Sequence, residues 1–155
     1  MPSMPVPIEG EALRLVAPCG LYCGGCLAFS GGPIRSHARA LTDLLGPNFS
    51  AYAERLAAMN PALGNFPQFA QLLEFLASGS CQGCREGGCL LGNCGVRECV
   101  LKRGVSFCGL CPDFPCQNPG LPEGLLESWR KNGERIRSNG PAALLELVRT
   151  RPRYP

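Results

Sequence analysis

The sequence predicts a small, mostly helical domain whose helices pack around irregular, cysteine-rich loops held by metal ions, with little β-structure. Eleven of the 155 residues are cysteine, and eight of them lie between Cys81 and Cys116. Apolar residues recur at helical spacing on both sides of this stretch. No run of alternating β-branched residues is long enough to predict a strand. The stretch itself holds few large apolar side chains, so we expect metal to hold it together.

The chain length suits one domain, and the 20 glycines and 15 prolines indicate many turns. We expect a single cysteine-rich domain at residues 18–151, with a flexible arm before it at 1–17 and a short tail after it at 152–155. The domain has three expected parts: a helical insertion at about 33–79, the main cysteine stretch at 81–116, and C-terminal helices at about 121–149.

Three helices are predicted in the insertion. The first begins at Pro33, which the first turn of a helix tolerates, and ends before Gly46. The second covers about 50–59. The third covers 66–77 and is the strongest amphipathic segment of the chain. Its apolar face consists of Phe66, Phe69, Leu72, Leu73 and Leu76. We expect these three helices to supply most of the ordinary hydrophobic core.

Two further helices are predicted after the cysteine stretch. One begins at Pro122 and runs to about Lys131, where the pair Asn132-Gly133 is expected to break it. The last begins at Pro141 and carries apolar residues at helical spacing. The first ten residues, with three prolines, are expected to form a loose arm.

The cysteine spacing is the strongest sign of a metal site. The main stretch reads C-x2-C-x4-C-x4-C-x4-C-x8-C-x2-C-x4-C. The C-x2-C unit occurs three times, at 23–26, 81–84 and 108–111, and one tight turn of this length aims two sulfurs at a single ion. The candidate ligands are all eleven cysteines: Cys19, Cys23, Cys26, Cys81, Cys84, Cys89, Cys94, Cys99, Cys108, Cys111 and Cys116.

Zinc is the expected cofactor, at two to three ions per chain. A structural zinc contributes about 10–16 kcal/mol of apparent binding free energy at neutral pH, whereas a whole domain is stable by only ~5–15 kcal/mol. One site can therefore decide whether the cysteine stretch folds. Four thiolates also suit a [4Fe–4S] cluster, so an iron–sulfur cofactor is the alternative.

The grouping of the ligands stays open at this stage. Eight cysteines in the main stretch suit two four-cysteine sites, which leaves Cys19, Cys23 and Cys26 one ligand short. His37 is the only histidine and is a candidate for the missing ligand, against the alternative of an ordinary core or surface side chain. The sites can instead interleave, with the Cys23–Cys26 pair joining a knuckle that lies far away in the sequence.

Several segments resemble a known family in order and spacing. They are APCGLYCGGC at 17–26, CQGC at 81–84, CGVREC at 94–99, KRGVSFCGLCPDFPC at 102–116 and ERIRSNG at 134–140. Over about residues 18–151 the chain resembles domain-of-unknown-function family 3795, a group of cysteine-rich bacterial and archaeal proteins regarded as zinc-binding. Ten of the eleven cysteines match the family's pattern, and Cys89 departs from it. The resemblance implies a metal-binding fold and no particular activity.

The sequence favours a zinc finger-like binding or accessory protein over an enzyme. It contains no phosphate-binding loop, dinucleotide fingerprint or nucleophile elbow, and its carboxylates are scattered. An iron–sulfur protein in electron transfer is the second interpretation. The weakest is a metalloenzyme with an open three-cysteine site at Cys19, Cys23 and Cys26.

Location and partners are indicated only broadly. The chain shows no leader with a basic and then an apolar region, and its odd number of cysteines favours reduced thiols, so we expect a cytoplasmic protein. We expect no membrane partner, because the long uncharged segment 15–34 contains five glycines, two prolines and three cysteines. The segment from Arg130 to Arg153 is basic, so nucleic acid or an acidic protein is a possible partner, but a solvated helix end is favoured.

Overall fold

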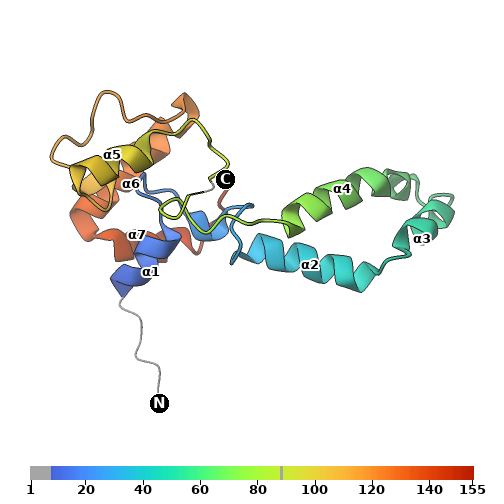
Figure 1. Ribbon diagram of the computed structural model, residues 1–155. Coiled ribbons are helices and arrows are strands. Elements are labelled where there is room, and N and C mark those ends of the chain that lie inside the picture. Colours follow the sequence, from blue (N-terminus) through green and yellow to red (C-terminus); the bar gives the residue numbers. More distant parts are fainter. Residues whose placement is uncertain (1–7, 88) are drawn as a thin grey trace, which may run out of the picture. The chain divides into compact units, whose positions relative to one another are not determined.

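The computed structural model describes residues 8–87 and 89–155, and most of that part of the chain is helical (Figure 1). Its α-helices are α1 (Ile8–Leu15), α2 (Pro33–Leu45), α3 (Phe49–Leu56), α4 (Phe66–Ala77), α5 (Val96–Arg103), α6 (Leu126–Asn139) and α7 (Pro141–Val148). Its 3-10 turns are η1 (Cys23–Gly25), η2 (Pro61–Asn65), η3 (Cys108–Leu110) and η4 (Glu123–Leu125). Within the described residues the only β-pairing outside these elements is one isolated bridge, between Val16 and Tyr22. The predicted mostly helical class is confirmed.

The chain divides into two compact units. Unit 1 combines Met1–Cys26 with Cys81–Pro155, and unit 2 is Leu27–Ser80. Unit 2 therefore covers the segment that we expected as a helical insertion. No helix in residues 8–87 and 89–155 combines the length and the apolar character that crossing a membrane requires.

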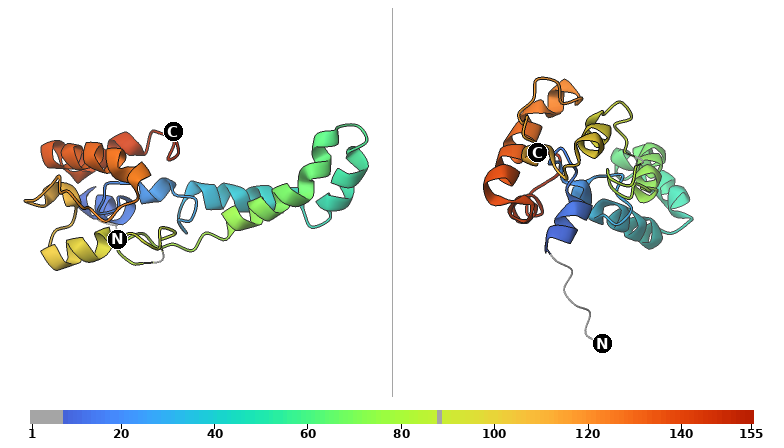
Figure 2. Two further views of the ribbon diagram at one scale, coloured as in Figure 1. Left: turned by 90° about the horizontal axis from the view of Figure 1, so that it is seen from above. Right: turned by 60° about the vertical axis from the view of Figure 1, so that its left-hand side comes forward.

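Unit 2 is a helical hairpin. Helices α2 and α4 lie side by side, and α3 with η2 connects them at one end (Figures 1 and 2). Helix α2 begins with Pro33 at its first position and ends at Gly46, whose φ of +76° is unfavourable for other residues. The predicted bounds of α2 and α4 agree with the structure, whereas α3 ends three residues before the predicted end.

The apolar residues of unit 2 are less buried than we predicted. On α4, Leu73 is buried, but Phe69 is 43% exposed and Leu72 is 56% exposed. Most of the buried apolar residues in the described part of the chain belong to unit 1 instead. The prediction that the three insertion helices supply most of the core was therefore wrong. A two-layer hairpin of short helices has few positions that are covered on all sides.

Unit 1 begins with a helix where we expected a flexible arm. Helix α1 packs against α7, and its Ala12 is fully buried. An ion pair joins the two helices, between Glu11 Oε1 and Arg149 Nη2 at 3.0 Å. The sequence pattern was weak because only eight residues are helical, and an isolated helix of that length is unstable in water. Tertiary contacts with α7 stabilise it. Of the predicted loose arm, residues 1–7 lie outside the described residues.

Helix α5 lies inside the main cysteine stretch, where we predicted irregular loops. It buries Val96 and Val100, which are one turn apart. Gly104 ends the helix in the left-handed conformation with φ +64°, and the next N–H, from Val105, donates to the Val100 carbonyl at 3.1 Å. This is the hydrogen-bond pattern of a Schellman cap. Basic residues followed by glycine are the sequence signal that marks this helix end.

Helix α6 continues through Asn132-Gly133, so the predicted break was wrong. It begins at Leu126 and not at Pro122. Both residues of the pair have tertiary roles instead. The Asn132 side chain donates from Nδ2 to the Gly20 carbonyl at 2.9 Å. A Cβ at Gly133 would clash with the ring of Phe114, and a Cβ at Gly109 in η3 would clash with the backbone of Gly133. Glycine at both positions lets η3 lie directly on α6.

Replacing Gly133 with alanine should destabilise the protein, although alanine is the better helix former by roughly 1 kcal/mol. The added methyl group has no space against Phe114, and overpacking of this kind costs typically 1–3 kcal/mol. Chemical denaturation followed by circular dichroism measures the change. The control is Gly124→Ala in η4, where a Cβ would have no neighbour within 4 Å and should change stability by less than about 0.5 kcal/mol. Equal effects of the two substitutions would contradict the close packing of η3 on α6.

Candidate metal centre

All eleven cysteines lie in unit 1, and none forms a disulfide in the structure. They fall into two groups. The four-thiol group consists of Cys99, Cys108, Cys111 and Cys116, which line one cavity. The seven-thiol group consists of the remaining cysteines, Cys19, Cys23, Cys26, Cys81, Cys84, Cys89 and Cys94, which neighbour Cys19, Cys23 or Cys84 electrostatically, and Cys108 also acts on Cys19. The lining of the cavity therefore divides the main cysteine stretch between Cys94 and Cys99, and Cys108 is the lining thiol that also neighbours Cys19.

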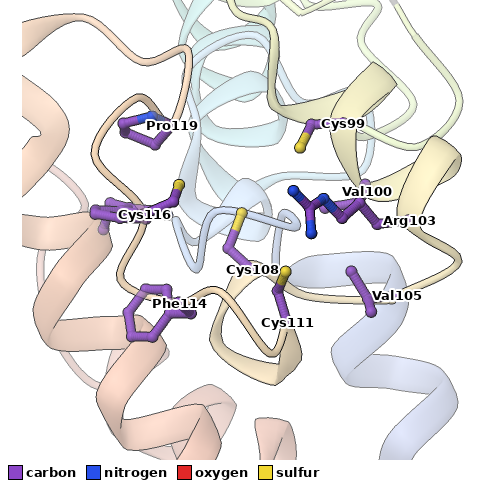
Figure 3. Close-up of a pocket in the computed structure, with 10 residues that line it drawn as sticks. Cys99, Val100, Arg103, Val105, Cys108, Cys111, Phe114, Cys116 and Pro119 are labelled. Carbon is purple, nitrogen blue, oxygen red and sulfur yellow. The ribbon is translucent and has the colours of Figure 1, made fainter.

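The four-thiol group surrounds a cavity of about 30 Å³. The thiols come from α5, from η3 and from the loop after it, and they face a common space (Figure 3). The remaining wall is largely apolar and includes Val100, Val105, Phe114, Pro119 and Trp129. A cavity of this size has room for one or two water-sized groups. Such an enclosed, sulfur-lined space is suited to a soft metal ion.

The sulfurs do not yet have the spacing of a closed single-ion site. Among the described residues no three His, Cys, Asp or Glu side chains are close enough together to hold one ion. Tetrahedral zinc places neighbouring sulfurs roughly 3.8 Å apart, given Zn–S bonds of about 2.3 Å. Loading a single ion at the four-thiol group would therefore require the thiols to move inward.

Cys108 is the thiol of the four-thiol group whose pKa responds most clearly to burial. Burial raises the pKa of its thiol above the ordinary value, and the neighbouring thiols of Cys99, Cys116 and Cys111 raise this pKa further. The Trp129 indole N–H acts in the opposite direction and lowers the pKa of Cys108. No atom meets full hydrogen-bond geometry with Trp129 Nε1, which is buried. The indole proton is thus near the Cys108 sulfur without being fully bonded to it.

One cationic side chain lies at the edge of the same cavity. The Arg103 guanidinium lies between the Cys99 and Cys108 side chains in the view of Figure 3. It also pairs with the carboxylate of Asp113. That pairing is the main cause that raises the pKa of Arg103, and the thiols of Cys111 and Cys99 add to it. Asp113 therefore acts as the partner of Arg103, and its charge offsets the cation.

Two of the three C-x2-C pairs adopt the same turn. In η1 the Cys26 N–H donates to the Cys23 carbonyl at 2.9 Å, and in η3 the Cys111 N–H donates to the Cys108 carbonyl at the same distance. The residue that ends each turn has nearly the same backbone conformation, with φ, ψ of −70°, 138° at Cys26 and −68°, 136° at Cys111. A buried glycine, Gly24 or Gly109, follows the first cysteine of each turn.

Arg137 of α6 holds η3 in place. Its guanidinium donates to three backbone carbonyls, those of Gly109 at 2.9 Å, Phe114 at 3.0 Å and Cys111 at 2.6 Å. It also lies 5.3 Å from the centre of the Phe114 ring. One side chain thus fixes the backbone on both sides of Cys111, in the loop that carries three of the four thiols.

Arg85 performs a similar task next to the seven-thiol group. It directly follows Cys84 and donates to the carbonyls of Leu13 at 2.7 Å, Val16 at 2.5 Å and Ser106 at 2.6 Å. Its guanidinium lies 4.7 Å from the centre of the Phe107 ring. Burial lowers the pKa of Arg85, while the thiols of Cys84 and its neighbours act in the opposite direction. This arginine therefore ties the knuckle at 81–84 to α1 and to the segment before η3.

The seven-thiol group is strongly buried at its centre. Burial is the largest cause that raises the pKa of Cys19 to about 12 and that of Cys84 to about 11. Burial also raises the pKa of Cys23, and the backbone N–H of Cys84 lowers it by hydrogen bonding. A further backbone donor, the Gly83 N–H, lies 3.4 Å from the Cys81 sulfur. The thiols of Cys19, Cys23 and Cys84 are therefore protonated at neutral pH unless a metal replaces the protons.

The positions of the cysteines indicate which of them can share a metal site, a question that the sequence left open. Cys23 lies among Cys26, Cys81 and Cys89, so the Cys19–Cys26 segment joins the knuckle at 81–84 instead of standing alone. Cys89, which departs from the family pattern, lies near Cys84 in the same group, and its side chain is exposed. His37 lies in α2 of unit 2 and is exposed, and its role as a ligand stays a prediction.

The sequence analysis missed the three residues that support the thiols. Trp129 fell only within the helix predicted to begin at Pro122, Arg137 lay only in a family motif, and no role was predicted for Arg85. For two of them, the position in the sequence was a usable signal. Arg85 directly follows a knuckle cysteine, and Arg137 lies in the family segment ERIRSNG. Nothing in the local sequence indicates that these arginines bond carbonyls far away in the chain.

The basic C-terminal segment is partly neutralised by neighbours within unit 1. Arg149 pairs with Glu11 and also with Glu146 at 3.4 Å, and Lys131 pairs with Glu127 at 2.6 Å. The Tyr154 hydroxyl donates to the Cys26 sulfur at 3.7 Å. The Tyr154 contact places the end of the chain next to η1. A nucleic-acid partner stays a weak prediction.

Arg137→Gln should loosen η3, because it removes a charged donor from three carbonyls. Hydrogen bonds from charged groups are worth about 1.5–3 kcal/mol, so we expect a loss of roughly that size in stability and faster release of bound metal to a chelator. Denaturation and chelator kinetics measure the two effects. The control is Arg135→Gln on the same helix, since Arg135 is exposed and its contact to Asn132 is long, at 3.4 Å. Equal effects of both substitutions would contradict the assigned role.

Comparison with known proteins identifies the family. Residues 15–120 match the family described as "Protein of unknown function (DUF3795)". No curated protein and no solved structure matches the chain. The matched region contains α5, η1, η3 and all eleven cysteines, while α6 with Trp129 and Arg137 lies beyond it. The chain belongs to the DUF3795 family.

Proposed function

We propose that the protein is a cytoplasmic zinc-binding protein in which metal centres held only by thiolates stabilise unit 1, and that it acts as a binding or accessory module. The observation that carries the proposal is the four-thiol group. Four cysteines from α5, from the η3 turn and from the loop after it line one cavity, and an otherwise unpartnered indole N–H is buried in its wall. Four thiolates form the ligand set of a closed structural zinc site.

The residues of the four-thiol group fit a divalent ion. The knuckle Cys108–Cys111 supplies two ligands from one turn, and Cys99 and Cys116 supply the other two from opposite sides. Apolar walls exclude water, and Trp129 and Arg137 provide the outer contacts that hold ligand positions. When bound, the ion would link α5 to η3 and so cross-link the main cysteine stretch. A second centre would draw its ligands from the seven-thiol group.

Two observations bear on the identity of the metal. The small cavity, about 30 Å³, favours one ion over a cube of four irons and four sulfides. The separation of the sulfurs favours the iron–sulfur alternative, because a cluster needs its thiolates further apart than a single ion does. We take the cavity volume as the stronger guide, because thiols on loops can close inward more readily than packed apolar walls can open.

Anaerobic purification followed by metal and sulfide analysis tests the proposal. We expect a colourless protein with about two zinc ions per chain, one for each thiol group. A brown protein that contains iron and sulfide would favour the electron-transfer alternative. A protein without bound metal would refute both.

The two thiol groups can be separated by substitution. Cys111→Ser should remove about one zinc ion from the four-thiol group, and Cys84→Ser should remove about one from the seven-thiol group. Each variant serves as the control for the other, because each should keep the ion of the intact group. Loss of all metal in both variants would show that the groups do not bind independently.

Metal binding should release protons. The raised pKa values favour neutral thiols, so protons compete with the metal at pH 7 and the metal affinity falls as the pH falls. We expect about four protons released for each ion in a four-thiolate site. Calorimetric titration of metal-free protein in buffers of different ionisation enthalpy gives this number. Release of fewer than about two protons per ion would contradict an all-thiolate ligand set.

A further inference from the structure

Trp129 lies at the contact between α6 and the four-thiol group. It is the only tryptophan of the chain and is 1% exposed. Its ring packs edge-to-face against Phe114, with ring centres 4.9 Å apart and planes inclined by 68°. Phe114 in turn lies under the guanidinium of Arg137. The indole is therefore held on one face by a residue that is itself fixed, and it has little freedom to turn.

The polar atom of this side chain has no partner. Nε1 is buried, and no atom of the described structure has hydrogen-bond geometry with it. Buried N–H groups in folded proteins are rarely left unpaired, and each exception requires an explanation. An indole is a donor only, so the missing partner must be an acceptor. The other residues that line the cavity offer apolar groups, the cation of Arg103 and four sulfurs. Sulfur is therefore the acceptor that the cavity provides.

The protonation state of the sulfur decides how well it accepts a hydrogen bond. A neutral thiol is a weak acceptor, whereas a thiolate carries a charge and forms a stronger, shorter hydrogen bond. Thiolates arise in this cavity when a metal ion displaces the protons. Metal binding would therefore give the buried indole N–H the strong acceptor that it lacks in the structure.

We infer that the Trp129 indole N–H donates a hydrogen bond to the Cys108 thiolate when the four-thiol group binds metal, and that Trp129 is a positioning residue of that centre. Cys108 is the first residue of η3, which packs on α6, and it lines the same cavity as Trp129. The indole also acts on the Cys108 thiol. The backbone of Cys108 is also fixed, since its N–H donates to the Pro18 carbonyl at 2.8 Å. The donor therefore lies on α6 and the acceptor on η3, and these two elements pack on each other.

The hydrogen bond has a definite consequence for the metal. Four thiolates and one divalent ion carry a net charge of −2, and the cation that lines the cavity, Arg103, is already paired with Asp113. A donor on the buried side withdraws charge from one sulfur and orients its lone pairs. Outer contacts of this kind typically change metal affinity by about 10- to 100-fold. This inference rests on the proposed metal site, and the experiment separates the two.

The experiment replaces the metal with ¹¹³Cd and observes the cadmium and indole resonances of the wild-type protein. A ¹¹³Cd resonance at the position of four-thiolate coordination would support the metal site. A coupling between ¹¹³Cd and the indole proton, transmitted through the N–H···S bond, would support the role of Trp129. A four-thiolate resonance without this coupling would overturn the inference and leave the metal site intact. Absence of any thiolate-bound cadmium would overturn both.

A matched substitution gives a second measurement. Because Trp129 is the only tryptophan, a tryptophan auxotroph can replace it specifically with 3-benzothienylalanine, which keeps the bicyclic shape but has sulfur in place of the N–H. We expect about 10- to 100-fold weaker zinc binding at the four-thiol group in competition with a chelator, and unchanged binding at the seven-thiol group. Unchanged affinity at both groups would overturn the inference. Trp129→Phe should show at least the same loss, because it removes the N–H and part of the ring.

Discussion

The contact between η3 and α6 is the constraint on which the four-thiol group depends. Gly109 and Gly133 carry no side chain at the point of contact, so that the two backbones lie close together and the Phe114 ring fits against Gly133. Arg137 then reaches from α6 to the carbonyls around Cys111. A metal-binding turn is usually positioned by its metal, but here a helix positions one side of it. The ion is left to bring Cys99 and Cys116 toward a knuckle that is already in place.

The cysteines of unit 1 are also part of its hydrophobic core. Buried Cys19, Val96, Val100, Phe114 and Trp129 belong to one cluster with Ala17, and most of the other thiols pack against that cluster. A neutral thiol behaves as a small apolar side chain, so the metal-free unit retains packing interactions around its ligands. Deprotonation in the same place is unfavourable unless a cation accompanies it. Packing and metal binding are therefore coupled through the same sulfur atoms, and protonation of these thiols favours loss of the ion.

The sequence predicted those elements whose signals are local. Helix α4 was predicted to the residue because its apolar period is strong, and α7 because Pro141 marks its first position. The failures share a different cause. Asn132-Gly133 is a turn signal by local rules, yet the pair continues a helix because Gly20 and Phe114 contact it from distant parts of the chain. The prediction that the helices of unit 2 supply most of the core also failed. The spacing of apolar residues indicates which face of a helix is apolar, but not whether another element covers that face.

The candidate ligands were all found from composition and spacing, but their grouping was not. Spacing counts residues along the chain, whereas grouping depends on which segments meet. The Cys108 N–H bonds the Pro18 carbonyl, and Arg85 bonds the Val16 carbonyl, so the N-terminal segment is fixed between two knuckles. Both bonds use backbone acceptors, which every residue offers. A sequence pattern cannot identify such partners, and for this reason the division between Cys94 and Cys99 emerges only from the structure.

The four-thiol group has a protected side and an accessible side. Cys108 is held from the buried side by α6, whereas Cys99 is exposed on α5. The cation nearest to the accessible side, Arg103, is itself exposed and shared with Asp113, so solvent screens its effect on the thiolates. Bonds to the buried sulfur act in a medium of low polarity and are stronger for it. Exchange of the ion should therefore begin with the bond to Cys99, while the knuckle and α6 retain the remaining ligands in place.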